Sequence, residues 1–198
     1  KGTASVDANT NRIAFKQNLA GVSIGPLLRD AVGQDLLEGR GNVALDMTTT
    51  GNLVSAMKKA LNGTARLELK DGAIKGINLA QSLRNARALF AGGKRETEQG
   101  AVAGEKTDFS ELTASFEIRN GIAHNGDFLA KSPFLRLTGE GDINLPDSTL
   151  NYLAKAAVVA SSAGQGGKEM ADLKGLTIPV RASGPFTALK YKLEFGSA

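Results

Sequence analysis

The chain has 198 residues, with 24 Lys and Arg against 20 Asp and Glu, no Cys, no Trp and a single His. The absence of Cys excludes disulfides, Cys-ligated zinc, iron–sulfur clusters and thiol nucleophiles, and the lone His124 excludes any metal site with two His ligands. The net charge of +4 comes from cations and anions interspersed along most of the chain, so we expect a solvated surface and no nucleic-acid partner.

Alternation of apolar and polar residues along most of the chain predicts antiparallel strands with one buried face. In chain order, the strands are expected near 3–8, 11–17, 36–49, 62–70, 73–77, 108–119, 122–130, 133–145, 149–159, 174–184 and 188–195.

Three short segments have the residues of tight turns between these strands. Asp71-Gly72 and Asn120-Gly121 are able to take the positive φ of two-residue hairpins, and Pro146-Asp147-Ser148 is a further turn. We therefore expect three hairpins, which pair 62–70 with 73–77, 108–119 with 122–130, and 133–145 with 149–159.

Three other segments change to helical spacing. The first has Pro26 in its first turn and ends at Gly33. Asn52 is expected to cap the second helix, and Asn78 the third and longest helix. The third helix carries an apolar stripe at four-, three- and four-residue spacing: Leu79, Leu83, Ala86 and Phe90.

Two stretches near 92–106 and 161–172 are rich in Gly and polar residues and predict mobile loops. The whole is expected to form a single domain over residues 1–198 of the α+β class, dominated by β-structure. Its architecture would be a curved antiparallel sheet of hairpins, with about three short helices packed on it or inserted beside it.

A recurrent frame places glycine on the apolar face of three strands. The frame Leu-x-Gly-x-small-x-apolar-x-Leu spans 37–45, 61–69 and 137–145. Glycine at these positions either lets the strand bend and a helix pack closely, or opens a groove for a ligand, and bending is the favoured interpretation.

The sequence offers no combination of residues typical of a catalytic or metal site. His124 lies beside a turn without a partner nucleophile, and Asp142 and Asp147 lack the graded spacing of an EF-hand loop. The Gly-rich stretch 164–168 lacks the spacing of a phosphate-binding loop. We therefore expect no catalytic residues, no metal and no cofactor.

One window without acidic residues, from Gly72 to Arg95, carries a concentration of cations in and after the third helix. The candidates for contact with an anionic membrane surface are Arg84, Arg87, Lys94 and Arg95. The alternative, which we favour, is that the apolar stripe covers the sheet and the cations stabilise the helix C-terminus.

A series of short motifs, in order, resembles the C-terminal region of the AsmA family of bacterial envelope proteins from about Leu37 to Phe195. The motifs include Asp71-Gly72-x-x-x-Gly76-Ile77-Asn78-Leu79, Thr107-x-Phe109-Ser110-x-Leu112, Leu137-x-Gly139-x-Gly141-x-Ile143-x-Leu145, Leu150-x-Tyr152 and Gly175-Leu176-x-Ile178-Pro179-Val180. The resemblance implies a periplasmic protein tethered to the inner membrane by a segment upstream of Lys1. It also implies a role in outer-membrane assembly or lipid transfer, with an apolar groove and no catalytic residues.

Two functions follow as hypotheses. In the first, the apolar face shields acyl chains of phospholipid or another envelope lipid, through Leu112, Phe116, Ile118, Leu135, Leu137, Ile143 and Leu145. In the second, the three helices cover that face, and the domain is a structural module that binds envelope proteins through exposed strands or the loop 92–106. Whether the apolar face is open and continuous decides between them.

Overall fold

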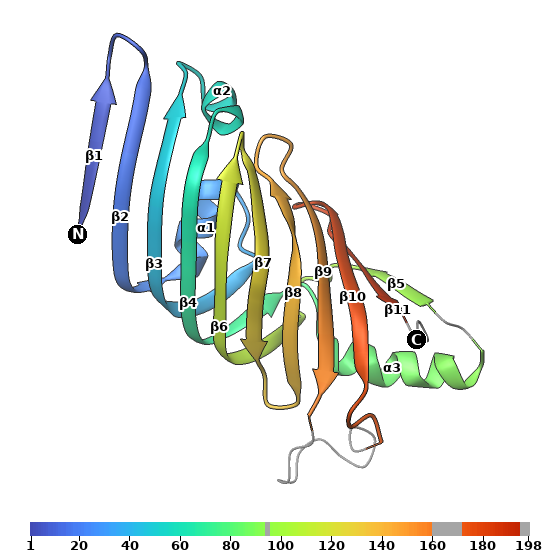
Figure 1. Ribbon diagram of the computed structural model, residues 1–198. Coiled ribbons are helices and arrows are strands. Elements are labelled where there is room, and N and C mark those ends of the chain that lie inside the picture. Colours follow the sequence, from blue (N-terminus) through green and yellow to red (C-terminus); the bar gives the residue numbers. More distant parts are fainter. Residues whose placement is uncertain (94–95, 160–171, 195–198) are drawn as a thin grey trace.

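The computed structural model describes residues 1–93, 96–159 and 172–194, which form one open antiparallel sheet of eleven strands with three helices (Figure 1). The strands are β1 (Gly2–Asp7), β2 (Arg12–Ser23), β3 (Leu37–Thr50), β4 (Asn62–Lys75), β5 (Glu96–Gly100), β6 (Lys106–Arg119), β7 (Ile122–Lys131), β8 (Leu135–Asn144), β9 (Thr149–Val158), β10 (Thr177–Pro185) and β11 (Lys190–Glu194). The helices are α1 (Ile24–Val32), α2 (Val54–Lys59) and α3 (Leu79–Ala91). The expected β-dominated fold class is confirmed.

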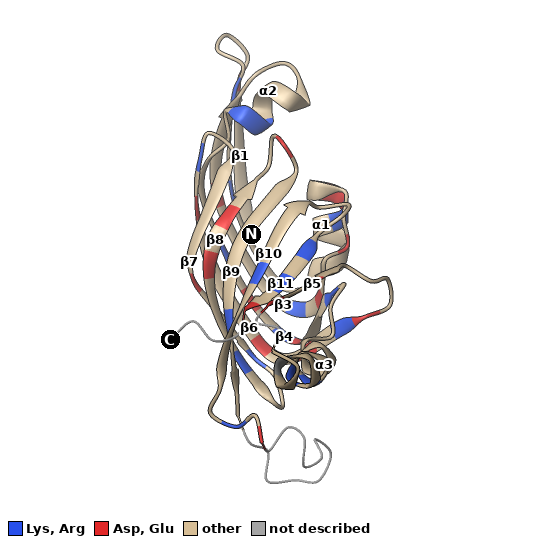
Figure 2. Ribbon diagram, turned by 90° about the vertical axis from the view of Figure 1, so that its right-hand side faces the viewer, with Lys and Arg blue, Asp and Glu red and all other residues tan. Residues whose placement is uncertain are grey.

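Strand order follows chain order with one exception. After β4 the chain runs through α3 and β5 before it returns to β6, and β5 pairs with β11 at the far edge, giving the order β1-β2-β3-β4-β6-β7-β8-β9-β10-β11-β5. The sheet therefore curls until the loop after β5 reaches the end of β4, where two backbone hydrogen bonds join Gly76 to Val102 and Glu105. All three helices lie on the side toward which the sheet curls (Figure 2).

The helix-bearing face of the sheet is apolar, and its lower half forms the core. We define the lower end as the end with α3 and the β7–β8 turn, and the upper end as the end with α2 and the β6–β7 turn (Figure 1). A row of direct cross-strand partners spans the lower half, here termed the sealed row: Gly41, Leu69, Leu112, Ala130, Leu137, Ala156 and Ile178. Every non-glycine member of the sealed row is at most 3% exposed, and Leu79, Leu83 and Ala86 of α3 belong to the same buried cluster.

Most of the predicted elements are confirmed. The hairpins around Asn120-Gly121 and Pro146–Ser148 form as β6–β7 and β8–β9. Gly33 ends α1 in the left-handed conformation with a φ of 74°, and the Asn78 side chain caps α3 by accepting a hydrogen bond from the Gln81 backbone N–H. The stripe on α3 packs into the core at its first three positions, and the Phe90 side chain lies outside the described part of the structure.

The hairpin predicted at Asp71-Gly72 is wrong. Strand β4 continues through these residues to Lys75, and its pairing with β3 shifts register between Glu38 and Arg40. Asp71 takes a positive φ of 47°, as the prediction required, but the two residues form a β-bulge within one long strand. A turn dipeptide has the backbone freedom to form either a hairpin or a bulge. A bulge forms here because the neighbouring strands β3 and β6 both continue past the site.

Two further expectations need correction. Asn52 does not cap α2, because the N-cap residue is Leu53, which has no side-chain capping bond. The stretch 92–106 is not a loop throughout, since its middle forms β5, where Glu96 and Glu98 pair with Lys192 and Lys190 of β11 at 2.9 and 3.5 Å. Most of the second predicted loop, 161–172, lies outside the described residues.

The recurrent glycines let neighbouring backbones approach each other. A Cβ atom built on Gly41, Gly63 or Gly141 would lie 1.9, 2.0 or 2.4 Å from a carbonyl oxygen of the adjacent strand. The space at these positions is therefore filled by the sheet itself, and this favours the bending interpretation of the glycine frame over the ligand groove.

Candidate functional site

A second row of cross-strand partners crosses the upper half of the helix-bearing face. Its members, here termed the open row, are direct neighbours on seven strands: Phe15, Met47, Gly63, Ile118, Ala123, Ile143 and Leu150. Ile118 and Ala123, at its centre, are 4% and 5% exposed, whereas Phe15, Met47, Ile143 and Leu150 are only half-buried. The apolar face is therefore continuous from β2 to β9, and it is partly accessible along this row.

The two rows differ because of what lies over them. Helix α3 and the strands β10 and β11 contribute buried side chains to the same cluster as the sealed row, among them Leu83, Val180 and Leu193. Helix α1 brings Ile24 into contact with that cluster on the β3 side. Phe15, Met47 and Ile143 of the open row are not part of this cluster and are only half-buried.

The seven residues predicted to face lipid divide between the two halves. Leu112 and Leu137 belong to the sealed row, and Leu135, at 1% exposed, lies in the same cluster. Ile118 and Ile143 belong to the open row. Phe116 is half-buried beside the open row, opposite Ala65 of β4, and Leu145 is half-buried just after β8.

A buried polar cluster next to the open row was not predicted from the sequence. Asn125 is 1% exposed at a bulge in β7, where its amide donates to the Ser115 carbonyl at 2.8 Å and to the Asp127 carboxylate at 2.7 Å. The Tyr152 hydroxyl donates to the Asn125 side-chain oxygen, and the Tyr152 ring meets that of Phe128 edge-on with centroids 5.8 Å apart. The side-chain polar atoms of Asn125 and Tyr152 are thus paired within the apolar face.

The pKa values in this cluster follow from burial and hydrogen bonding. Burial raises the pKa of the Tyr152 hydroxyl, and the negative charges of Asp127 and Glu140 act in the same direction. Burial acts to raise the pKa of Asp127 too, but hydrogen bonds from Ser115 and Asn125 outweigh it and lower that pKa. The cluster therefore holds a neutral tyrosine beside an ionised carboxylate, and it fixes the β7 bulge.

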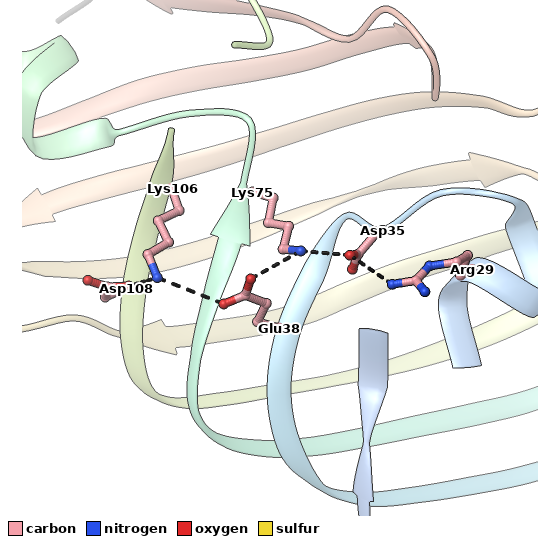
Figure 3. A network of polar contacts seen from close by, with 6 residues as sticks. All are labelled: Arg29, Asp35, Glu38, Lys75, Lys106 and Asp108. Carbon is pink, nitrogen blue, oxygen red and sulfur yellow. Dashed lines mark hydrogen bonds and ion pairs between the residues drawn. The ribbon is translucent and has the colours of Figure 1, made fainter. Parts of the chain in front are cut away.

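A chain of ion pairs fastens the α1–β3 connection to the lower end of the sheet (Figure 3). The Lys75 ammonium lies 2.7 Å from Asp35 and 3.1 Å from Glu38, and Arg29 of α1 reaches Asp35 at 3.2 Å. The hydrogen bond from Lys75 lowers the pKa of Asp35, and the reciprocal bond raises the pKa of Lys75. This latch (Arg29, Asp35, Glu38 and Lys75) holds α1 against the apolar face.

The basic residues of α3 have partners within the chain. Arg84 donates a hydrogen bond to Gln81 at 2.7 Å, and Arg87 pairs with Asp172 at 2.8 Å. Lys94 and Arg95 lie outside the described residues. Because Leu79, Leu83 and Ala86 of the apolar stripe are buried in the core, the membrane contact predicted for this helix has only its outer side available, where Leu89 is 41% exposed.

The opposite face of the sheet carries a shallow hollow of about 730 Å³ across β2, β3, β4, β6 and β7. Lys16, Arg66 and His124 are among its lining residues, and each has an acidic partner: Asp46, Glu68 and Asp142 respectively. Within the described ranges, no three His, Cys, Asp or Glu side chains gather as a metal site would require. No helix in that part of the chain has the length and apolar character to cross a membrane.

Comparison with known proteins gives two matches. Residues 1–128 match the model of the AsmA family. The chain is also 28% identical over 193 residues to the protein AsmA of Escherichia coli strain K12, an alignment that covers 98% of this chain and 31% of that protein. The chain thus spans about a third of the length of this relative, and no solved structure matches it.

Proposed function

Because the chain belongs to the AsmA family, we propose that it is a non-catalytic part of an envelope protein that serves outer-membrane assembly or lipid transport. In this proposal the protein is tethered to the inner membrane and this part of it lies in the periplasm. The open row is the surface that receives the acyl chains of a phospholipid or a similar envelope lipid.

The observation that carries the proposal is the continuity of the open row. Its members are direct cross-strand neighbours over seven strands, and four of them are half-buried although they are apolar. A sheet that needed this face only for its own core would cover both rows, since leaving apolar side chains exposed forgoes about 25 cal/mol per Å². The paired Asn125 and Tyr152 leave no unsatisfied side-chain polar group next to an acyl chain.

The lipid-binding surface ends at the sealed row. Its side chains are enclosed by α3, β10 and β11, so an acyl chain on the open row meets a closed core toward the lower end. We propose that this part of the protein therefore closes one end of the apolar surface and offers the other end to lipid.

Extraction and mass spectrometry of lipid from the purified protein tests the proposal. We expect phospholipid to co-purify with the wild type, and several-fold less of it with the double variant Phe15→Ser/Ile143→Ser. The control Leu129→Ser removes an aliphatic side chain that is 37% exposed and lies between two exposed threonine partners, Thr113 and Thr138. It should retain the lipid at the wild-type level.

The alternative function is a structural or interaction module that binds envelope proteins and has no lipid surface of its own. The burial of part of the apolar face favours this alternative, because four of the seven predicted lipid-facing residues are at most 4% exposed: Leu112, Ile118, Leu135 and Leu137. A wild-type protein that carries no phospholipid would support this alternative and contradict the lipid proposal.

A further inference from the structure

Two of the most exposed large apolar side chains of the described chain are adjacent at the upper end of the molecule. Leu53 is 68% exposed and Val54 is 70% exposed, at the start of α2, a helix that contains no buried residue. We call residues 51–60 the tip. Figure 1 shows α2 at the upper end of the sheet, where it connects the ends of β3 and β4.

The tip is held firmly by the strands around it. The Thr49 hydroxyl donates to the Met57 carbonyl at 2.5 Å, and the Gly51 N–H donates to the Asn11 carbonyl at 3.2 Å. Leu61, directly after the tip, accepts a hydrogen bond from the Gly121 N–H at 2.9 Å, which joins it to the β6–β7 turn. Because these contacts fix the tip, little conformational entropy is lost when Leu53 and Val54 bind a partner.

Along the chain, the charge next to these two side chains is positive. No Asp or Glu occurs from Met47 to Leu67, while Lys58 and Lys59 form the last turn of α2 (Figure 2). The only other charge in that stretch, Arg66, pairs with Glu68 further down β4. Among the described residues, neither lysine of the tip has an ion pair.

We propose that the tip docks on an anionic lipid bilayer. Leu53 and Val54 would enter the boundary between headgroups and acyl chains, and the ammonium groups of Lys58 and Lys59 would lie among the phosphates. Positive charge with adjacent exposed aliphatic side chains is complementary to such a surface, and Met47 of the open row is only six residues from Leu53 along the chain.

This inference deepens the proposed function, because it names the membrane surface that the upper end of the open row would face. The two fail separately, however. Bilayer docking is measured on vesicles and depends on the tip, whereas lipid retention is measured on the purified protein and depends on the open row.

A tryptophan introduced into this chain reports on the tip without interference, because its 198 residues contain no other tryptophan. We expect the emission of Leu53→Trp to shift to shorter wavelength with vesicles of phosphatidylglycerol and phosphatidylcholine. It should shift much less with phosphatidylcholine alone, and the shift should decrease as salt is added. Leu176→Trp, an exposed position (48%) directly before β10, is the control and should not shift.

Co-sedimentation with the same anionic vesicles tests the residues themselves. Leu53→Ser/Val54→Ser and Lys58→Gln/Lys59→Gln should each bind about tenfold more weakly than the wild type. Ser is a favoured N-cap residue, so the substitution at Leu53 should not weaken α2. The control Val102→Ser/Leu176→Ser removes two aliphatic side chains that are 49% and 48% exposed elsewhere and should bind as the wild type does.

The variant Arg84→Glu/Arg87→Glu tests, in the same assay, whether the α3 surface contributes to vesicle binding. Wild-type binding by this variant, with loss in the tip variants, supports the proposal. Loss in the α3 variant with full binding by the tip variants would assign the contact to α3 and overturn it. An unchanged emission of Leu53→Trp on anionic vesicles would overturn it as well.

Discussion

At the scale of single residues, the glycines of the apolar face act through the backbone of the neighbouring strand. Gly63 has a φ of 142°, and a Cβ atom there would lie 2.0 Å from the Asp46 carbonyl oxygen. We expect Gly63→Ala to lower the free energy of unfolding in urea by about 2–4 kcal/mol, because it adds both a collision and backbone strain. Gly100→Ala in β5 is the matched control, since nothing lies within 4 Å of its Cβ position, and it should change stability little.

The ion pair of Asp35 predicts how the free energy of unfolding changes at acidic pH. Its pKa is lowered chiefly by the hydrogen bond from Lys75, so its stabilising contribution is complete above the unfolded-state value of 3.8 and is lost as the pH falls through the lower folded-state value. The wild type should therefore lose stability as the pH falls below about 4. Asp35→Asn should be less stable at neutral pH and show a shallower acid decline, whereas Asp30→Asn on the exposed side of α1 should follow the wild type. Equal acid slopes for Asp35→Asn and the wild type would contradict the role of the latch.

At the scale of elements, the bulge of β7 depends on one buried amide. Asn125→Ala would leave the Tyr152 hydroxyl and the Ser115 carbonyl without their partner, and we expect a loss of about 2–3 kcal/mol of unfolding free energy. Tyr152→Phe removes one bond of the cluster and should cost about 1 kcal/mol. Asn18→Ala, an exposed amide on β2, is the control for urea unfolding. A cost for Asn125→Ala no larger than that of the control would show that the bulge forms without the cluster.

The elements that could be predicted from the sequence are those with a strong local pattern. Strict alternation predicted β6, β7, β8 and β9. The turn at Asn120-Gly121 predicted the pairing of β6 with β7, and the turn at Pro146–Ser148 the pairing of β8 with β9. Strand β5 was missed because its sequence, from Glu96 to Gly100, has no apolar residue, and it forms a strand only because β11 offers an edge with complementary lysines. The bulge at Asp71-Gly72 was mistaken for a hairpin because local backbone freedom does not reveal where the neighbouring strands end.

The same distinction applies to the candidate site. Alternation correctly assigned Leu112, Ile118, Leu137 and Ile143 to one apolar face. It could not divide them into sealed and open rows, because that division depends on where α3, β10 and β11 pack, which involves contacts between distant parts of the chain. The hydrogen bond between Asn125 and Tyr152 could not be predicted from the sequence either, because Tyr152 lies 27 residues away and two strands across the sheet.

At the scale of the whole molecule, the fold has two different ends. The lower end is a packed core, closed by α3 and by the loop that returns from β5 to Gly76. The upper end carries the open row, four of whose residues are half-buried, and the exposed apolar tip. The large share of glycine, 24 of 198 residues, contributes to this asymmetry, because several of these glycines let a long sheet bend around one face.

The central claim is that the open row contacts lipid, and photo-crosslinking at two adjacent residues tests it most directly. Phe15 belongs to the open row, and Lys16 is exposed and lines the hollow on the opposite face. With benzoyl-phenylalanine at each position in turn, irradiation in the presence of radiolabelled phospholipid should label the protein substituted at Phe15 and leave the protein substituted at Lys16 unlabelled. Equal labelling at the two positions, or no labelling at Phe15, would contradict the account.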